Sequence, residues 1–163
     1  IINSFALLLL VGMVINEHIQ AKKEAKNSRF CKNGQSTVVL GGLSATLAKA
    51  KRQNKAVYLL FTGSDWSPSC ISHEKLVLQD SRWERLAQNN MVTYTCDFPV
   101  KEPMSKQTRQ GLNRLASSFG VTQYPTQIIL DPSGKELARR EGYIPGPVGP
   151  YISWVRSVLF AAR

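Results

Sequence analysis

The part of the sequence with the clearest chemical potential is a four-residue Ser-x-x-Cys, from Ser67 to Cys70, which follows an apolar run and a tryptophan, Trp66. A strand that leads through a turn into a helix opened by Cys-x-x-Cys is the arrangement of a dithiol redox site. There the helix N-terminus stabilises the thiolate of the first cysteine, and the second thiol resolves the mixed disulfide. In this chain a serine stands at the first position.

This serine determines which chemistry is expected. A hydroxyl is too weak an acid to replace a thiolate unless a base lies beside it. His73 follows Cys70 by three residues and therefore faces roughly the same side of the helix one turn later. We predict that His73 is a partly exposed helix residue rather than a base for Ser67. Ordinary dithiol exchange is not expected, and Cys70 remains a candidate catalytic monothiol.

Turn and strand signals follow in the C-terminal half. Tyr124-Pro125 predicts a turn before a strand at 126–130, and Asp131-Pro-Ser-Gly134 predicts a hairpin turn into a strand at 135–140. Strands that alternate with helices and end in a hairpin predict an α/β sheet covered on both faces. The other expected elements are strands at 57–62 and 91–97, helices at 44–53, 68–78, 103–119 and 151–161, and a helix that opens with a capping box at 81–84.

Three segments carry a family resemblance: Phe61-Thr-Gly-Ser-Asp-Trp66, Val121-Thr-Gln-Tyr-Pro125-Thr126 and Asp131-Pro-Ser-Gly134. Together they resemble the thioredoxin-like superfamily, in particular bacterial exported thiol-disulfide oxidoreductases that read FTGSDWCxxC. The resemblance extends from about Gly42 to the C-terminus. It implies a thioredoxin-like fold, in which a central mixed sheet is flanked by helices.

The resemblance also assigns roles to single residues. It implies that Cys70 holds the resolving, buried position and that Ser67 replaces the usual nucleophilic cysteine. It implies that Pro125 is a cis-proline, a minority state that a folded protein keeps only where a turn requires it. The residues to which it assigns substrate binding are Trp66, Tyr124, Pro125 and Thr126.

The N-terminal end of the chain differs in composition from the rest. Phe5 to Ile15 is an uninterrupted apolar run, shorter than the roughly 20 residues that span a bilayer and similar to the core of a signal peptide. We predict a hydrophobic signal anchor or membrane helix at 1–19, a basic tether at 20–41 and a thioredoxin-like domain at 42–163. A removed signal peptide and a buried soluble helix are the alternatives for the first segment.

Two observations disagree on the side of the membrane. The basic residues from Lys22 to Lys32 flank the apolar run, and such residues normally stay in the cytoplasm. The family resemblance implies the exported, periplasmic side. We predict export, and a cytoplasmic-facing domain is the alternative. Cys31 lies in the tether, and a buried position is expected for Cys96.

The positive charge of the chain indicates which classes of binding partner are expected. The formal net charge is +10, and basic residues cluster at 49–55 and 106–114, which favours an acidic partner or anionic lipid. Nucleic acid is not expected, because no aromatic residues interleave with the basic ones and no binding motif is present. His18 and His73 are isolated, so the sequence predicts no metal site, and no cofactor is predicted.

Two functions from different classes follow. The first is a membrane-anchored thioredoxin-fold protein with a degenerate Ser-x-x-Cys site, which binds a protein partner as a scaffold module or as a subunit of a larger assembly. The alternative is a thiol-disulfide oxidoreductase that acts on a protein-thiol substrate, either as a monothiol through Cys70 or with Ser67 as an engineered replacement of a catalytic cysteine. Ser67 favours the first function, and the intact surroundings of the site favour the second.

Overall fold

A computed structural model describes residues 39–162. Its centre is a four-stranded sheet in the order β2-β1-β3-β4. The strands are β1 (Ala56–Thr62), β2 (Met91–Asp97), β3 (Thr126–Leu130) and β4 (Glu136–Glu141). Strands β1 and β2 are parallel, whereas β3 runs antiparallel to both β1 and β4. The predicted mixed sheet is therefore confirmed.

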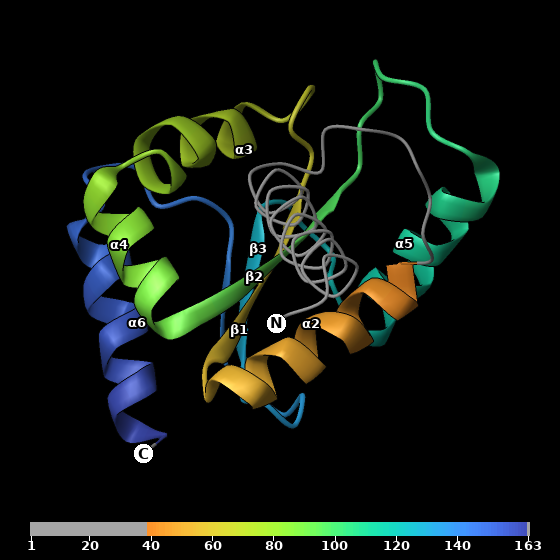
Figure 1. Cartoon of the computed structure of the whole chain (residues 1–163). Coiled ribbons are helices and arrows are strands. Elements are labelled where there is room, and N and C mark those ends of the chain that lie inside the picture. Colours follow the sequence, from red (N-terminus) through yellow and green to blue (C-terminus); the bar gives the residue numbers. More distant parts are fainter. Residues whose placement is uncertain (1–38, 163) are drawn as a thin grey trace, which may run out of the picture. The chain divides into compact units, whose positions relative to one another are not determined.

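Helices cover both faces of this sheet, as predicted (Figure 1). Helices α2 and α5 bury one face, and α3, α4 and α6 lie over the other. The helices are α2 (Val39–Gln53), α3 (Pro68–His73), α4 (Ser81–Asn90), α5 (Lys106–Ser118) and α6 (Gly149–Ala161), with a π-helical segment, η1 (Glu74–Leu78), that continues α3.

Strand β1 is buried along its whole length because it lies inside the sheet and both its faces are covered. Its side chains alternate between two cores. Leu59 and Phe61 join the core beneath α2 and α5, whereas Tyr58 and Leu60 join the core beneath α4 and α6. The strand thus fixes the point at which the chain leaves the sheet for the Ser-x-x-Cys segment.

The first described helix is longer than predicted. Helix α2 begins at Val39, five residues before the expected cap at Ser44. The helix continues through Gly42, where a β-carbon would lie 2.7 Å from the Tyr94 hydroxyl oxygen. A glycine pair normally weakens a helix, but here the missing side chain lets the helix backbone approach β2. The sequence pattern alone does not reveal that tertiary contact.

Two helix starts also differ from the prediction. Asp80, one residue before the predicted capping box, caps α4 by accepting a hydrogen bond from the N–H of Arg82 at 2.8 Å. The Ser105 hydroxyl caps α5 by accepting the N–H of Thr108 at 3.1 Å, so that helix begins later than expected. Both caps use a side-chain oxygen to satisfy an N–H group that has no partner within the helix. Strand β4 and helix α6 differ from their expected bounds by one or two residues.

The predicted anchor at 1–19, the tether up to residue 38 and Cys31 lie outside the described residues. Between residues 39 and 162, no helix is long and apolar enough to cross a membrane. Cys96 is fully buried on β2, in the core against which Val92 and Tyr94 also pack, so its predicted burial is confirmed.

Candidate functional site

Ser67 lies at the point where the chain turns from β1 into α3. It is the N-cap of that helix, and its hydroxyl oxygen accepts a long hydrogen bond, 3.4 Å, from the N–H of Cys70. Pro68 follows in the first helical turn, where its missing N–H costs nothing. Ser67 is 6% exposed. A serine at this position therefore satisfies the helix end and leaves no ionisable group there.

The Cys70 thiol is turned into the protein. The residue is 1% exposed, and its sulfur accepts a hydrogen bond from the N–H of Gly63 at 3.3 Å. The thiol therefore lies over the end of β1, in the buried position that the resemblance implies for a resolving cysteine. A disulfide in solution does not reach this sulfur unless the site opens.

The expectation that His73 is partly exposed is wrong. The side chain is 1% exposed, and its ring packs against those of Tyr143 and Tyr151, with centroids 6.4 and 5.4 Å away. Burial lowers the pKa of His73 from 6.5 to about 4. Both tyrosines come from the last quarter of the chain, so local spacing gave no sign of them. Within the described residues His73 Nε2 has no hydrogen-bond partner, and it does not serve Ser67 as a base.

The aromatic side chains of Trp66, Phe98 and Tyr124 lie together beside the Ser-x-x-Cys segment, and we call them the aromatic rim. The Trp66 indole is 43% exposed, and its Nε1 donates a hydrogen bond to the carbonyl oxygen of Phe98 at 2.8 Å. Tyr124 packs edge-on against Trp66, with ring centroids 6.0 Å apart, and against Phe98 at 5.1 Å. Trp66 and Tyr124, which are 58 positions apart in the sequence and which the resemblance assigns to substrate binding, are thus brought into contact.

Gly63 fits closely beneath the Trp66 indole. A β-carbon on Gly63 would lie 2.4 to 2.6 Å from three indole atoms. We expect Gly63→Ala to displace the ring, break its hydrogen bond to Phe98 and cost about 1–3 kcal/mol of unfolding free energy. Tryptophan emission should shift to the red, and iodide quenching should increase. Gly149→Ala is the matched control, because nothing lies within 4 Å of a β-carbon there. Unchanged emission in Gly63→Ala would contradict the contact.

The loop before β3 carries the predicted cis-proline. The Tyr124–Pro125 peptide bond is cis, which confirms that prediction. Thr126 is buried, and its hydroxyl donates to the carbonyl oxygen of Gln123 at 2.8 Å. The carbonyl oxygen of Pro125 accepts the N–H of Gly142 at 2.8 Å. These bonds hold both ends of the turn that presents Tyr124.

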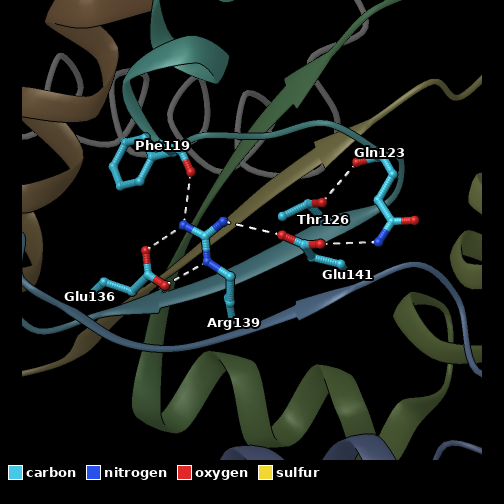
Figure 2. A network of polar contacts seen from close by, with 6 residues as sticks. All are labelled: Phe119, Gln123, Thr126, Glu136, Arg139 and Glu141. Atoms are coloured by element: carbon cyan, nitrogen blue, oxygen red, sulfur yellow. Dashed lines mark hydrogen bonds and ion pairs between the residues drawn. The ribbon is translucent and has the colours of Figure 1, made fainter.

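A polar network outside the sequence prediction ties this loop to the edge strand β4 (Figure 2). The Arg139 guanidinium contacts the carboxylates of Glu136 and Glu141 at 2.7 and 3.3 Å, and it donates to the carbonyl oxygen of Phe119 at 2.8 Å. Gln123 donates to Glu141 at 3.1 Å. The ion pair lowers the pKa of Glu136. The charged residues of β4 can be recognised in the sequence, but which groups they contact depends on how β4 pairs with β3 and could not be predicted from it.

The carboxylate of Asp65, next to Trp66 in the sequence, holds the loop that follows β2. Its carboxylate accepts N–H groups from Val100, Lys101 and Glu102 at distances from 2.6 to 3.3 Å. These backbone hydrogen bonds hold the pKa of Asp65 below its ordinary value. The carboxylate therefore stays ionised and fixes the loop after β2 beside the exposed tryptophan. Sequence reasoning missed this role, because the partners are main-chain N–H groups, which every residue type except proline provides.

The chemistry available at the site is thus a buried thiol, a capping hydroxyl and an aromatic rim. Burial, with a smaller contribution from the neighbouring Cys96 and Cys70 thiols, raises the pKa of Tyr124. Among residues 39–162, no cluster of three or more His, Cys, Asp or Glu side chains is placed to hold a metal ion. The thiol of the segment is therefore buried, and the exposed part of the site is the aromatic side chain of Trp66.

The sequence is similar to proteins of a known family. A family model for a thioredoxin-like domain matches residues 43–148. The disulfide bond reductase DsbH of Chlamydia pneumoniae is 35% identical over 113 residues, which cover 69% of this chain and 68% of that protein. The thioredoxin-related protein DsbJ of the same organism is 27% identical over 93 residues, which cover 57% of this chain and 27% of DsbJ.

Solved structures agree with the sequence comparisons. The structure of a DsbH oxidoreductase is 30% identical and superposes with a TM-score of 0.67, covering 83% of this chain and 98% of that one. A Thermus thermophilus thioredoxin, 24% identical with a TM-score of 0.54, covers 71% of this chain and 82% of its own and supports the fold alone. The mixed sheet, the cis-proline and the matched family model lead to one conclusion: the chain belongs to the thioredoxin-like family.

Proposed function

We propose that this chain is a thioredoxin-fold binding module that holds an extended segment of a protein partner beside Trp66 and Tyr124 without dithiol exchange. The observation that carries the proposal is the hydroxyl of Ser67 at the N-cap of α3, where the family resemblance implies a nucleophilic thiol. The only sulfur in the segment, that of Cys70, is turned inward. The fold is therefore complete, and the attacking group is missing.

The surroundings of the cis-proline support a docking role. Within the described residues, the main-chain N–H and C=O groups of Tyr124 make no hydrogen bond. Unpaired main-chain groups at the end of a strand pair readily with an extended segment, and neighbouring pockets then select its side chains. The exposed indole of Trp66 supplies apolar area beside them. A partner is thus held by backbone pairing and by aromatic contact.

A binding assay with a defined probe tests this proposal. Reduced and carboxymethylated insulin B chain is an extended peptide that no thiol exchange can trap. We expect the full chain to bind it, and Trp66→Ala to weaken binding by about tenfold, as for an aromatic anchor at an interface. Trp154→Ala on α6 is the matched control and should bind as the wild type does. Equal loss in both variants, or no binding by the wild type, would overturn the docking site.

The second candidate function is monothiol exchange through Cys70. It is favoured by the 35% identity to a protein named disulfide bond reductase. Insulin reduction distinguishes the two candidates, and we expect background turnover from the wild-type chain because its thiol is buried. Turnover that Cys70→Ala abolishes would show that Cys70 acts alone, and the binding-module proposal would then fail.

We further propose that residues 1–19 anchor the chain in a membrane, with residues 42–163 on the exported side. The apolar run from Phe5 to Ile15 supports the anchor. The full chain should stay in the membrane fraction at high salt and leave it in detergent; release by salt alone would contradict the anchor. A membrane-impermeant thiol reagent should label reduced Cys31 in intact cells. Labelling only after lysis would place the domain in the cytoplasm.

A further inference from the structure

A second concave surface lies between α4 and α6, which run side by side over one face of the sheet (Figure 1). The hollow has a volume of about 720 Å³ and no residue of the Ser-x-x-Cys segment lines it. Its walls carry Arg82 and Arg85 from α4 and Arg156 from α6, and its floor includes Leu86 and Ile152. We call this surface the α4–α6 groove.

The charge of the groove is positive and largely uncompensated. Arg82 forms an ion pair with Asp80 at 2.8 Å. No carboxylate among residues 39–162 lies within ion-pair distance of Arg85 or Arg156, and both side chains are exposed. Helix α6 contains no acidic residue, and α4 contains one, Glu84. Two guanidinium groups therefore face solvent across a hollow, and their planar forks match the two oxygens of a carboxylate.

The groove also offers apolar surface. Leu86 is buried at its floor, while Ile152 and Leu159 are half-buried along its α6 side. Phe160 stands at its end and is 80% exposed. When a partner covers this side chain, its burial contributes to binding. The contribution is about 25 cal/mol for each Å² of apolar area buried. The complementary ligand is therefore acidic and apolar together.

The lining of the groove favours a protein segment as the acidic partner. Exposed and half-buried apolar side chains, Ile152, Leu159 and Phe160, line the same hollow as the two arginines, so a segment with acidic and apolar side chains meets both kinds of group. Helix α4 has 10 residues, and a helix of that size is about 15 Å long, enough to line a short segment of a partner. The net charge of +10 also raises the encounter rate with an acidic partner.

We propose that the α4–α6 groove binds an acidic amphipathic segment of a partner protein. Carboxylates of that segment lie against Arg85 and Arg156, and its apolar side chains lie on Ile152 and Phe160. This surface is separate from the rim at Trp66, so the chain holds two segments at once. The inference does not depend on the function proposed for Ser67 and Cys70.

Fluorescence anisotropy with the full chain in neutral detergent tests the groove. The probe is a degenerate library of labelled 14-residue peptides that carry Glu or Asp at four positions and Leu, Ile or Phe at four others. We expect saturable binding that weakens several-fold when salt rises, because charged contacts are screened. A library with Gln and Asn in place of Glu and Asp should bind at least tenfold more weakly, as should the acidic library with Ala at its apolar positions.

Matched charge reversals locate the site. The double variant Arg85→Glu/Arg156→Glu should lose at least tenfold in affinity for the acidic library. Lys106→Glu/Arg114→Glu on α5 changes the net charge by the same amount outside the groove and should lose less than twofold. Phe160→Ser should weaken binding by several-fold while leaving the salt dependence unchanged. Circular dichroism of each variant should match that of the wild type, and Arg85→Gln/Arg156→Gln replaces any reversal that unfolds.

Three results would overturn the proposal. Equal loss in the α5 variant would mean that only the overall charge attracts the peptides. Equal binding of the neutral library would remove the role of the arginines. Binding of soluble glycerophosphoglycerol, the headgroup of phosphatidylglycerol, that Arg85→Glu/Arg156→Glu abolishes, without binding of the acidic library, would assign the surface to a lipid headgroup instead.

Discussion

Ser67→Cys is expected to convert the chain into a disulfide reductase, with insulin reduction at least about a hundredfold above the wild-type rate. The N-cap position already places the side chain at 67 against the N–H of Cys70, at the positive end of α3. A thiol there should have a lowered pKa, because the unpaired N–H groups favour its thiolate. Cys70 lies three residues on and would resolve the mixed disulfide.

Three further variants make this prediction specific. Ser67→Ala should have background turnover, which shows that the gain needs sulfur. Ser67→Cys/Cys70→Ala should accumulate a mixed disulfide and not turn over, because the resolving thiol is absent. Under mild oxidation Ser67→Cys should form a disulfide between positions 67 and 70. If it does not, the two side chains do not meet, and the segment is a binding surface that has lost its redox geometry.

The order of elements and their assignment to a mixed sheet follow from the sequence, because each strand and turn leaves a local signal. The run from Ala56 to Thr62 is apolar throughout, as a strand buried on both faces must be. The Asp131 turn is closed by the hydrogen bond from the N–H of Gly134 to the carbonyl oxygen of Asp131 at 3.0 Å. Local patterns of this kind locate elements without knowledge of their neighbours.

Features that depend on distant partners were missed. The start of α2 depends on Tyr94 approaching Gly42, and the position of Asp65 depends on main-chain groups 35 to 37 residues away. His73 lies beside tyrosines from the C-terminal end. In each case the residue pattern identified a helix or a turn, but the tertiary neighbours of the residue were determined by the fold. The resemblance assigned Trp66 and Tyr124 to one substrate-binding site, which spacing could not have done.

Burial of His73 has a consequence for stability that is open to measurement. The ring is enclosed by Tyr143 and Tyr151, and burial lowers its pKa to about 4 from the ordinary 6.5. Below pH 6.5 the unfolded chain therefore binds a proton that the folded chain does not, so stability falls as the pH falls from 6.5 towards 4. The full difference corresponds to about 3 kcal/mol of unfolding free energy, reached below pH 4.

We expect His73→Leu to remove this part of the pH dependence, because leucine has a similar volume and no proton to gain. Urea unfolding of the wild type should lose roughly 2 kcal/mol more than that of His73→Leu between pH 7 and pH 4.5. Asp65, Asp80 and Asp131, whose pKa values are lowered, lose their contributions at lower pH and do so equally in both proteins. Parallel pH profiles for the two proteins would contradict a neutral buried His73. A His73→Leu variant whose stability falls less than that of the wild type between pH 7 and pH 4.5 would show that this ring, one turn beyond Cys70, is buried in its neutral form.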